Sequence, residues 1–378
     1  MSQAKPRNPK ESAHLASQTP LETLSERDPN NPEWLPQSVE EALESDEKDK
    51  WRKAIDDELE QLREKGTWRL EELPEGREAV GCKWVFLRKK DEDGNIEAYK
   101  AQLVTQGFSQ KPRTDYSDTG TFAPVMRFET LRTMLALAAI NGWDMWQMDI
   151  KGAYLNGWLK EEIYMKQPAG FDDGSGLVCR LVRPLYGLKQ AGNEWNNEFD
   201  GAMKDLTYTN TRSDYCCYFR RQGENFAMVL VWVDDLVSFT NSPAESDRVE
   251  EELKSKFKIK ILGEPSLLLG MKISRNKELK VITLSQTHYI DKILERVGLQ
   301  DANSVATPID PSVNLEFDEE EHDRSINDRA SGTYAKAIGS LMYAAIGTRP
   351  DIAYAVHTLA KFTRSPQPRH WTAIKRVF

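Results

Sequence analysis

Two adjacent aspartates stand between two apolar runs in the segment VLVWVDDLVSF, residues 229–239. Asp234 and Asp235 fit the tip of a two-residue hairpin, because Asp tolerates turn positions. Asp-Asp is nevertheless not a favoured hairpin pair, whereas Asn-Gly and Asp-Gly are. Neighbouring carboxylates also repel each other unless a cation lies between them or one of them takes up a proton. A divalent ion such as Mg²⁺, which prefers carboxylate, phosphate and water oxygens, would remove that cost.

A metal site needs more ligands than one turn supplies. Asp149 lies at the end of a second short apolar strand, expected in WQMDIKGAYLNG at 146–157. It is either an ordinary Asp at a strand end or a carboxylate that converges with Asp234. In the second case, two Mg²⁺ ions held there could stabilise the attacking and leaving oxygens of a phosphoryl transfer. The three aspartates therefore point to phosphoryl-transfer chemistry.

The composition is that of a folded protein, with 39% hydrophobic and 29% charged residues. The polar first twenty residues contain no signal peptide, and the longest apolar runs, 134–140 and 226–233, are too short to span a bilayer. The four cysteines form no C-x-x-C pair and are expected to be reduced thiols. We therefore expect an intracellular protein that is neither secreted nor in a membrane.

The net charge of −9 argues mildly against nucleic acid as a partner. The charge is unevenly distributed, however. Residues 1–79 carry 20 acidic and 12 basic side chains, whereas residues 347–378 carry six basic residues and one acidic residue. The net charge therefore does not exclude a nucleic-acid partner.

Local patterns predict helices and strands interleaved along the chain. Residues 1–36 hold six prolines and few apolar residues, so we expect them to be disordered. Ser38 and Glu41 form a capping box before a helix or helix pair over 38–65. Other helices are expected over 128–142, 190–205, 243–258, 288–297, 335–346 and 351–361, and strands over 82–90, 96–104, 267–273 and 281–286. Residues 144–155 are expected to form a strand followed by a turn. An acidic loop is expected over 300–332. This order favours an α+β fold with antiparallel strands over a doubly wound parallel sheet.

Nine sequence blocks resemble those of the reverse transcriptase of copia-type long-terminal-repeat retrotransposons, and they occur in the same order as in that family. The resemblance runs from about Trp51 to the last residue. The blocks are GCKWVFLRKKDEDGNIEAYKAQLVTQGF, TFAPVMRFETLRTMLALAA, WQMDIKGAYLNGWLKEEIYMKQPAGF, RPLYGLKQAGNEW, VLVWVDD, LGMKI, LSQTHYIDKIL, TRPDIAYAVHTLAKF and HWTAIKRVF.

The resemblance implies a right-hand polymerase of fingers, palm and thumb, with the catalytic carboxylates on an antiparallel palm sheet. A reverse transcriptase domain would span 37–378 after a lead-in at 1–36, with fingers and palm over about 66–275 and a thumb- or connection-like region over about 276–378. Full-length relatives also carry protease, integrase and ribonuclease H. We therefore interpret the chain as a Pol polyprotein fragment that stops before ribonuclease H.

The same resemblance assigns roles at the metal site. Asp149 and Asp234 would bind Mg²⁺ or Mn²⁺, the backbone carbonyl of Ile150 would add an oxygen, and Asp235 would orient the site or help to bind the metals. The reaction would be attack of a primer 3′-hydroxyl on the α-phosphate of a deoxynucleoside triphosphate. The protein would accelerate the reaction mainly by positioning the reactants and neutralising the charge on the phosphates.

Nucleotide and nucleic-acid contacts follow from the resemblance in the same way. The nucleotide-binding candidates are Lys100, Gln102, Tyr154, Lys189 and Gln190. The primer or template candidates are Trp232, Lys361, Arg364 and Arg369. Tyr154 would exclude a 2′-hydroxyl, or else simply pack in the core. Lys100 would neutralise triphosphate charge, or else be a solvated lysine on a two-stranded ribbon. The glycines of LYGLKQAGNEW would allow a ligand close to the backbone, whereas Trp195 is expected in the core.

Two departures from the family pattern leave a second hypothesis open. Trp232 replaces the usual Tyr, and Gln102 replaces an Arg whose bidentate phosphate contact Gln cannot supply. The first hypothesis is an RNA-directed DNA polymerase that binds a template-primer and nucleotides. The second is a non-catalytic retrotransposon remnant or nucleic-acid-binding module. A third hypothesis, a phosphatase or nuclease that uses Asp residues, is not favoured, because the sequence lacks the metal-ligating His and the motif order of such enzymes.

Partners and location also follow from the resemblance. We expect other Pol-derived chains, ribonuclease H and integrase, to act with this one. We expect the protein in the cytoplasm, within a virus-like particle, or in the nucleus, or in both of these compartments.

Overall fold

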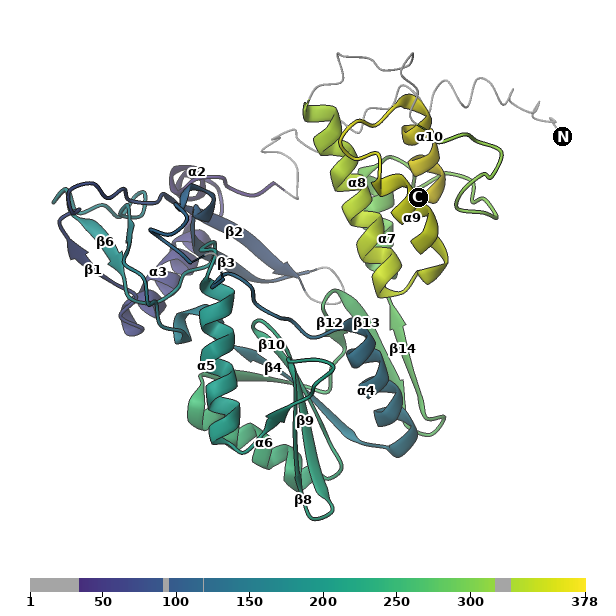
Figure 1. Cartoon of the computed structure of the whole chain (residues 1–378), viewed down its shortest axis with the longest axis horizontal. Coiled ribbons are helices and arrows are strands. Elements are labelled where there is room, and N and C mark those ends of the chain that lie inside the picture. Colours follow the sequence, from purple (N-terminus) through teal and green to yellow (C-terminus); the bar gives the residue numbers. More distant parts are fainter. Residues whose placement is uncertain (1–33, 91–94, 118, 317–327) are drawn as a thin grey trace. The chain divides into compact units, whose positions relative to one another are not determined.

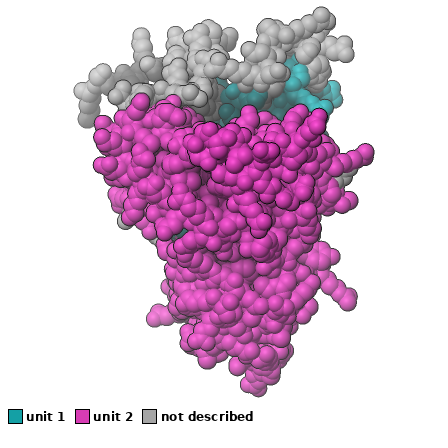
Figure 2. All heavy atoms as spheres, turned by 90° about the vertical axis from the view of Figure 1, so that its left-hand side faces the viewer, with its two compact units in different colours: residues 1–28, 267–274, 283–378 teal, residues 29–266, 275–282 magenta. Residues whose placement is uncertain are grey.

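A computed structural model describes residues 34–90, 95–117, 119–316 and 328–378. The chain divides into two units, drawn in different colours in Figure 2. The larger unit comprises residues 29–266 and 275–282, and the smaller unit comprises residues 1–28, 267–274 and 283–378. Most of the expected lead-in, part of the turn after the strand at 82–90 and part of the expected acidic loop lie outside the described residues.

The larger unit contains a six-stranded antiparallel sheet in the order β11-β4-β10-β9-β8-β7. Strands β4, β8, β9 and β10 are labelled in Figure 1. Its strands are β4 (Asp144–Ile150), β7 (Thr209–Asn210), β8 (Cys217–Gln222), β9 (Asn225–Trp232), β10 (Asp235–Thr240) and β11 (Ile259–Gly263). Helix α6 (Pro243–Lys256) packs on β4, β9 and β10. Strand β10 lies between β4 and β9, and its residues from 236 to 240 are all buried, including the polar Ser238 and Thr240.

Within the described residues, this unit also contains two smaller sheets, four more helices and the end of β13 (Met271–Asn276) with the start of β14 (Val281–Ser285). The strands are β1 (Trp68–Glu71), β5 (Ile163–Met165) and β6 (Val178–Leu181) in one sheet, and β2 (Cys82–Lys90) and β3 (Ile96–Thr105) in a hairpin. The helices are α2 (Val39–Glu44), α3 (Lys48–Glu64), α4 (Phe128–Asn141) and α5 (Ala191–Asp205), with short 3₁₀ turns η2 (Gly107–Ser109) and η3 (Ala153–Asn156). Helix α3 buries Trp51, Ile55, Leu59 and Leu62 at helical spacing and packs on β3.

The smaller unit is mostly helical. Its described residues form β12 (Leu267–Leu268), the first part of β13, most of β14, α7 (Thr287–Arg296), α8 (Asp328–Gly347), η4 (Pro350–Ile352), α9 (Ala353–Ala360) and α10 (Pro368–Val377). Residues of α8, α9 and α10 form its hydrophobic core. Among the residues that the structure describes, no helix is both long enough and apolar enough to cross a bilayer.

The predicted mixture of helices and antiparallel strands is confirmed, including the helix pair over 38–65, the hairpin at 82–104 and the burial of Trp195. The four cysteines are free, as expected. The helix expected over 351–361 is present as η4 and α9, and its Ile352, Val356 and Leu359 are buried in the helical core. The division into fingers, palm and thumb stays a prediction.

Three details of the sequence interpretation were wrong. The capping box is only half formed, because Ser38 accepts from the Glu41 N–H but Glu41 accepts from the Gln37 N–H instead. The strand expected over 267–273 is a tight β12–β13 hairpin, since Leu269 and Gly270 both have positive φ. Helix α8 begins at residue 328, inside the expected acidic loop.

Candidate active site

The tip of the β9–β10 hairpin brings the predicted carboxylates together. Trp232 pairs with Asp235 across the hairpin, so Val233 and Asp234 form a two-residue turn. Asp235 also pairs with Asp149 on the neighbouring strand β4. Directly opposed residues of antiparallel strands have their side chains on the same face and close together. The strand register therefore makes residues 149 and 235 neighbours, with Asp234 next to them.

The turn has an unusual backbone that its surroundings hold in place. Val233 has a φ of 56°, in the left-handed region that β-branched residues rarely adopt. Such a conformation costs roughly 1–3 kcal/mol and persists only where neighbours enforce it. The buried Trp195 indole N–H donates to the Val233 carbonyl over 3.0 Å, and the Ile150 N–H donates to the Asp234 carbonyl over 2.9 Å. The position of the turn against β4 is therefore fixed by hydrogen bonds.

The two oxygens of the Asp234 carboxylate have different surroundings. The Tyr186 hydroxyl donates to Oδ2 over 2.5 Å, whereas Oδ1 is buried with no hydrogen-bond partner. Burial raises the pKa of Asp234 most, and the charge of Asp149 raises it further. The Tyr186 hydrogen bond and the charge of Lys100 act in the opposite direction. Sequence reasoning missed Tyr186, although it lies inside a block that was singled out.

Asp235 is destabilised as an anion in the folded chain. Burial raises its pKa from the ordinary value of 3.8 to about 6, and the charges of Asp149 and Asp234 add to this effect. A hydrogen bond from Gln147 and the charge of Lys89 oppose it. A cluster of carboxylates that repel one another in this way is a site that a cation would stabilise.

This raised pKa predicts a pH-dependent gain in stability for Asp235→Asn in the absence of metal. The folded state favours protonated Asp235, so the charged form lowers stability above the folded pKa. That penalty fades as the pH falls through about 6 toward the unfolded value of 3.8. At pH 8 with EDTA, we expect the melting temperature of Asp235→Asn to lie roughly 2–4 °C above that of the parent chain.

Circular dichroism melts at several pH values measure this difference. It should shrink below pH 6 and be lost by about pH 4. Asp247→Asn, an exposed change on α6, is the control and should leave the melting temperature unchanged at every pH. A gain of equal size at every pH would contradict the explanation.

The residues present fit a divalent cation. The buried Oδ1 of Asp234 lacks a partner and lies next to the paired residues 149 and 235. Among the described residues, no three His, Cys, Asp or Glu side chains are already arranged to hold a metal. Mg²⁺ does not need such a cage, because it is commonly bound by one or two carboxylates together with water and substrate phosphates.

The β2–β3 hairpin carries two of the predicted nucleotide contacts. Lys100 and Gln102 lie two residues apart on β3, opposite Leu87 and Val85, so they share one face. Burial raises the pKa of both Asp234 and Glu58, and the charge of Lys100 offsets part of each rise, so Lys100 lies within electrostatic reach of these two carboxylates. The structure thus brings Lys100 toward the aspartates, while its contact with nucleotide stays a prediction.

The LYGLKQAGNEW segment has a largely internal structure. Gln190 is buried, and its amide bonds to Gln110, Asp115 and Glu161. The exposed Lys189 bonds to the Tyr116 hydroxyl over 3.0 Å and lies over that ring. Nucleotide contacts from Lys189 and Gln190 stay predictions.

The glycine at 187 serves a close approach to the chain itself rather than to a ligand. Gly187 has a φ of 95°, and a Cβ there would lie 2.1 Å from the Thr105 carbonyl oxygen. This packs the end of β3 against the segment that carries Tyr186. The expectation that this glycine makes room for a ligand is therefore corrected.

The remaining candidates lie in different places. The Tyr154 ring on η3 packs against the Tyr186 ring, with 4.3 Å between the ring centroids. The half-buried Trp232 packs against Phe128, with 5.8 Å between the ring centroids. The smaller unit contains the other predicted nucleic-acid contacts, Lys361, Arg364 and Arg369. Arg369 donates to the Asn314 and Glu316 carbonyls.

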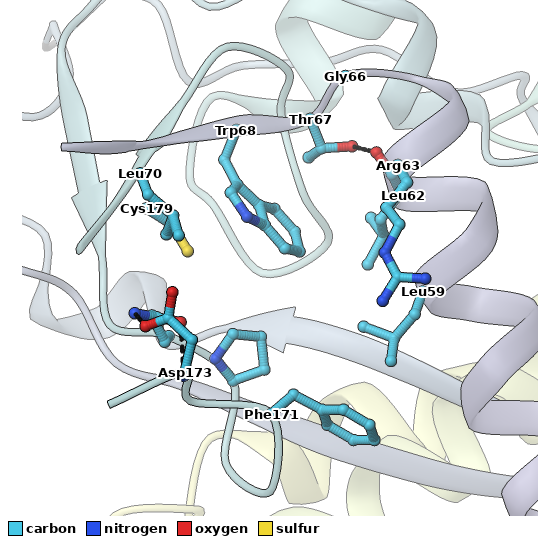
Figure 3. Close-up of a pocket in the computed structure, with 12 residues that line it drawn as sticks. Leu59, Leu62, Arg63, Gly66, Thr67, Trp68, Leu70, Phe171, Asp173 and Cys179 are labelled. Carbon is cyan, nitrogen blue, oxygen red and sulfur yellow. Dashed lines mark hydrogen bonds between the residues drawn. The ribbon is translucent and has the colours of Figure 1, made fainter. Parts of the chain in front are cut away.

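A cavity of about 410 Å³ lies elsewhere in the larger unit (Figure 3). Leu59 and Leu62 of α3 line it together with Trp68 of β1 and Phe171. None of the residues predicted for the active site lines it. Its lining is mainly apolar, and it contains no cluster of acidic side chains.

Comparison with known proteins places the chain in a family. The family described as "Reverse transcriptase (RNA-dependent DNA polymerase)" matches residues 65–311. A retrovirus-related Pol polyprotein from transposon TNT 1-94 of Nicotiana tabacum is 40% identical over 348 residues, which is 90% of this chain and 26% of that protein. The Pol polyprotein from transposon RE1 of Arabidopsis thaliana is 34% identical over 89% of this chain and 22% of that protein.

Solved structures are also similar. One of them is the foamy viral protease-reverse transcriptase in complex with double-stranded DNA, with a TM-score of 0.40 and 11% identity, over 86% of this chain and 47% of that one. The chain spans about a quarter of the length of the Pol polyproteins that it matches. The family match and the Pol polyprotein relatives confirm the resemblance found in the sequence blocks, and the chain belongs to the reverse transcriptase (RNA-dependent DNA polymerase) family.

Proposed function

We propose that this chain catalyses RNA-directed DNA synthesis, as the polymerase part of a copia-type Pol polyprotein. The observation that carries the proposal is the pairing of Asp149 with Asp235 beside Asp234, whose Oδ1 is buried without a partner. The six-stranded sheet would be the palm, the β2–β3 hairpin would belong to the fingers, and the helical smaller unit would form the thumb or connection.

Asp149 and Asp234 would hold Mg²⁺ or Mn²⁺, with Asp235 and the Ile150 carbonyl beside them. When bound, the metal ions would stabilise the charge on the attacking and leaving oxygens. The primer 3′-oxygen forms a bond to the α-phosphorus, the bond from that phosphorus to the bridging oxygen breaks, and pyrophosphate leaves. Lys100 would neutralise the triphosphate, and its charge already acts on Asp234.

The proposed partners are an RNA or DNA template, a DNA primer and deoxynucleoside triphosphates. Ribonuclease H and integrase would act from other Pol-derived chains. Lys361, Arg364 and Arg369 would neutralise phosphates of the template-primer, so binding should weaken as salt rises.

Primer extension on an RNA template with Mg²⁺ or Mn²⁺ tests the proposal. Template-dependent incorporation supports it. The second candidate is a nucleic-acid-binding module without catalysis, favoured by Gln102 and Trp232, which depart from the family pattern. Tight binding of an RNA–DNA duplex without any incorporation would establish that candidate instead.

Tyr154 provides a prediction about sugar selection. Its ring lies five residues after Asp149 and is supported by Tyr186 at 4.3 Å. If the ring excludes a 2′-hydroxyl, then Tyr154→Ala should lower the preference for dNTPs over rNTPs by at least about 10-fold, the size of a modest pocket contact. Single-nucleotide incorporation with each substrate gives the two values of kcat/KM.

The conservative Tyr154→Phe variant, which keeps the ring, should retain the preference. An unchanged preference in Tyr154→Ala would assign this ring to core packing alone.

A further inference from the structure

Tyr186 makes a directed contact with one oxygen of a proposed metal ligand. It lies in the segment between β6 and α5, and its hydroxyl donates to Asp234 Oδ2 over 2.5 Å. Asp234 Oδ1 is buried and accepts no hydrogen bond. The bond therefore uses one oxygen of the carboxylate and leaves the other without a partner.

Tyr186 is itself held from several sides. Its carbonyl accepts bonds from the Thr105 N–H over 2.8 Å and from the Thr105 hydroxyl over 3.0 Å. Gly187 brings the next peptide so close to Thr105 that a Cβ would clash with backbone. The Tyr154 ring packs 4.3 Å away on the Tyr186 side chain. A residue fixed at its backbone and its ring can orient a partner precisely.

We propose that Tyr186 is a positioning residue that holds Oδ2 of Asp234 so that Oδ1 is presented to a divalent cation. This inference rests on the proposed function. Carboxylates that bind metals are themselves commonly hydrogen-bonded by outer groups, which fix their orientation. Without the hydroxyl, Oδ2 loses its donor and Oδ1 still has none, and the terminal torsion of Asp is broad enough for the half-buried carboxylate to turn.

The inference can be tested independently of catalytic activity by measuring Mn²⁺ binding to the full chain with electron paramagnetic resonance, in the absence of nucleic acid. Tyr186→Phe keeps the ring and removes only the hydroxyl. We expect it to raise the Kd for Mn²⁺ by roughly 10- to 100-fold. In primer extension, kcat at limiting Mn²⁺ should fall and partly recover at saturating Mn²⁺, while KM for the nucleotide stays within about twofold, because the proposed nucleotide contacts are untouched.

Tyr218→Phe is the matched control. Tyr218 is a buried tyrosine on β8 of the same sheet, and its hydroxyl donates to the carboxylate of Asp200 over 3.3 Å. The Tyr218→Phe variant should bind Mn²⁺ with the same Kd as the parent chain. A Tyr186→Phe variant that is folded by circular dichroism and binds Mn²⁺ like the parent overturns the inference and leaves the polymerase proposal standing. A parent chain that neither binds Mn²⁺ nor extends a primer overturns the polymerase proposal itself.

Discussion

Replacing Asp234 by Asn should abolish primer extension. The substitution keeps the shape of the side chain and removes the charge that a divalent cation would bind through Oδ1. The expected loss in kcat exceeds the roughly 10²–10³-fold that follows removal of one electrostatic contact in an active site. Single-turnover incorporation of one nucleotide on an RNA template measures it, and gel shift should show template-primer binding within a few-fold of the parent chain.

Asp247→Asn, an exposed change on α6, serves as the control and should extend primers normally. Incorporation by Asp234→Asn at more than about a tenth of the parent rate would mean that the turn carboxylate is not a ligand. The melting temperature of Asp234→Asn should not fall, because the variant removes a charge that burial destabilises. A folded but inactive variant would thus separate chemistry from stability.

The largest expected effect on stability is at Arg220. This β8 residue is 3% exposed and bonds to Glu245 over 2.5 Å and Glu252 over 2.5 Å, both on α6. Removing one partner of a buried ion pair leaves uncompensated charge, at a cost of roughly 3–5 kcal/mol. We therefore expect Arg220→Met to lower the free energy of unfolding by that amount in urea denaturation, and to loosen α6 from the sheet that carries the aspartates.

Arg221→Met is the control, because Arg221 is exposed and its side chain donates to the nearby Gly223 carbonyl. It should change the free energy of unfolding by less than about 0.5 kcal/mol. The double variant Arg220→Met with Glu245→Met should recover part of the loss, since one buried charge is then removed with its partner. If Arg220→Met were as stable as the parent, the ion pair would have no net role in holding α6.

Much of the local structure could be predicted from the sequence because it follows from short-range chemistry. The amphipathic spacing from Trp51 to Leu62 specifies α3, and Gly142 ends α4 in the left-handed conformation. Short strands escaped prediction. Segments of three to five residues, such as β5 and β11, are too short to show a period, and their place depends on the strands beside them.

Among the active-site candidates, too, those marked by local sequence could be predicted, and those that depend on distant residues could not. Asp234 and Asp235 were recognisable because two charges interrupt an apolar run. Tyr186 was not, because its role depends on Asp234, which is 48 residues away in the chain. Gly187 was read as space for a ligand, but the backbone of Thr105 fills that space. Nothing in the local sequence distinguishes a glycine that admits a ligand from one that admits another strand.

By itself, the sequence determined that three aspartates lie at the ends of apolar strands, and nine blocks indicated the family. Only the tertiary structure decided that Asp235 pairs with Asp149, and that one oxygen of Asp234 is bonded while the other is left without a partner. The physical reason is register. Side chains alternate along a strand, so a slip of one residue between β4 and β10 would turn a carboxylate to the opposite face. Long-range packing, not local sequence, selects that register.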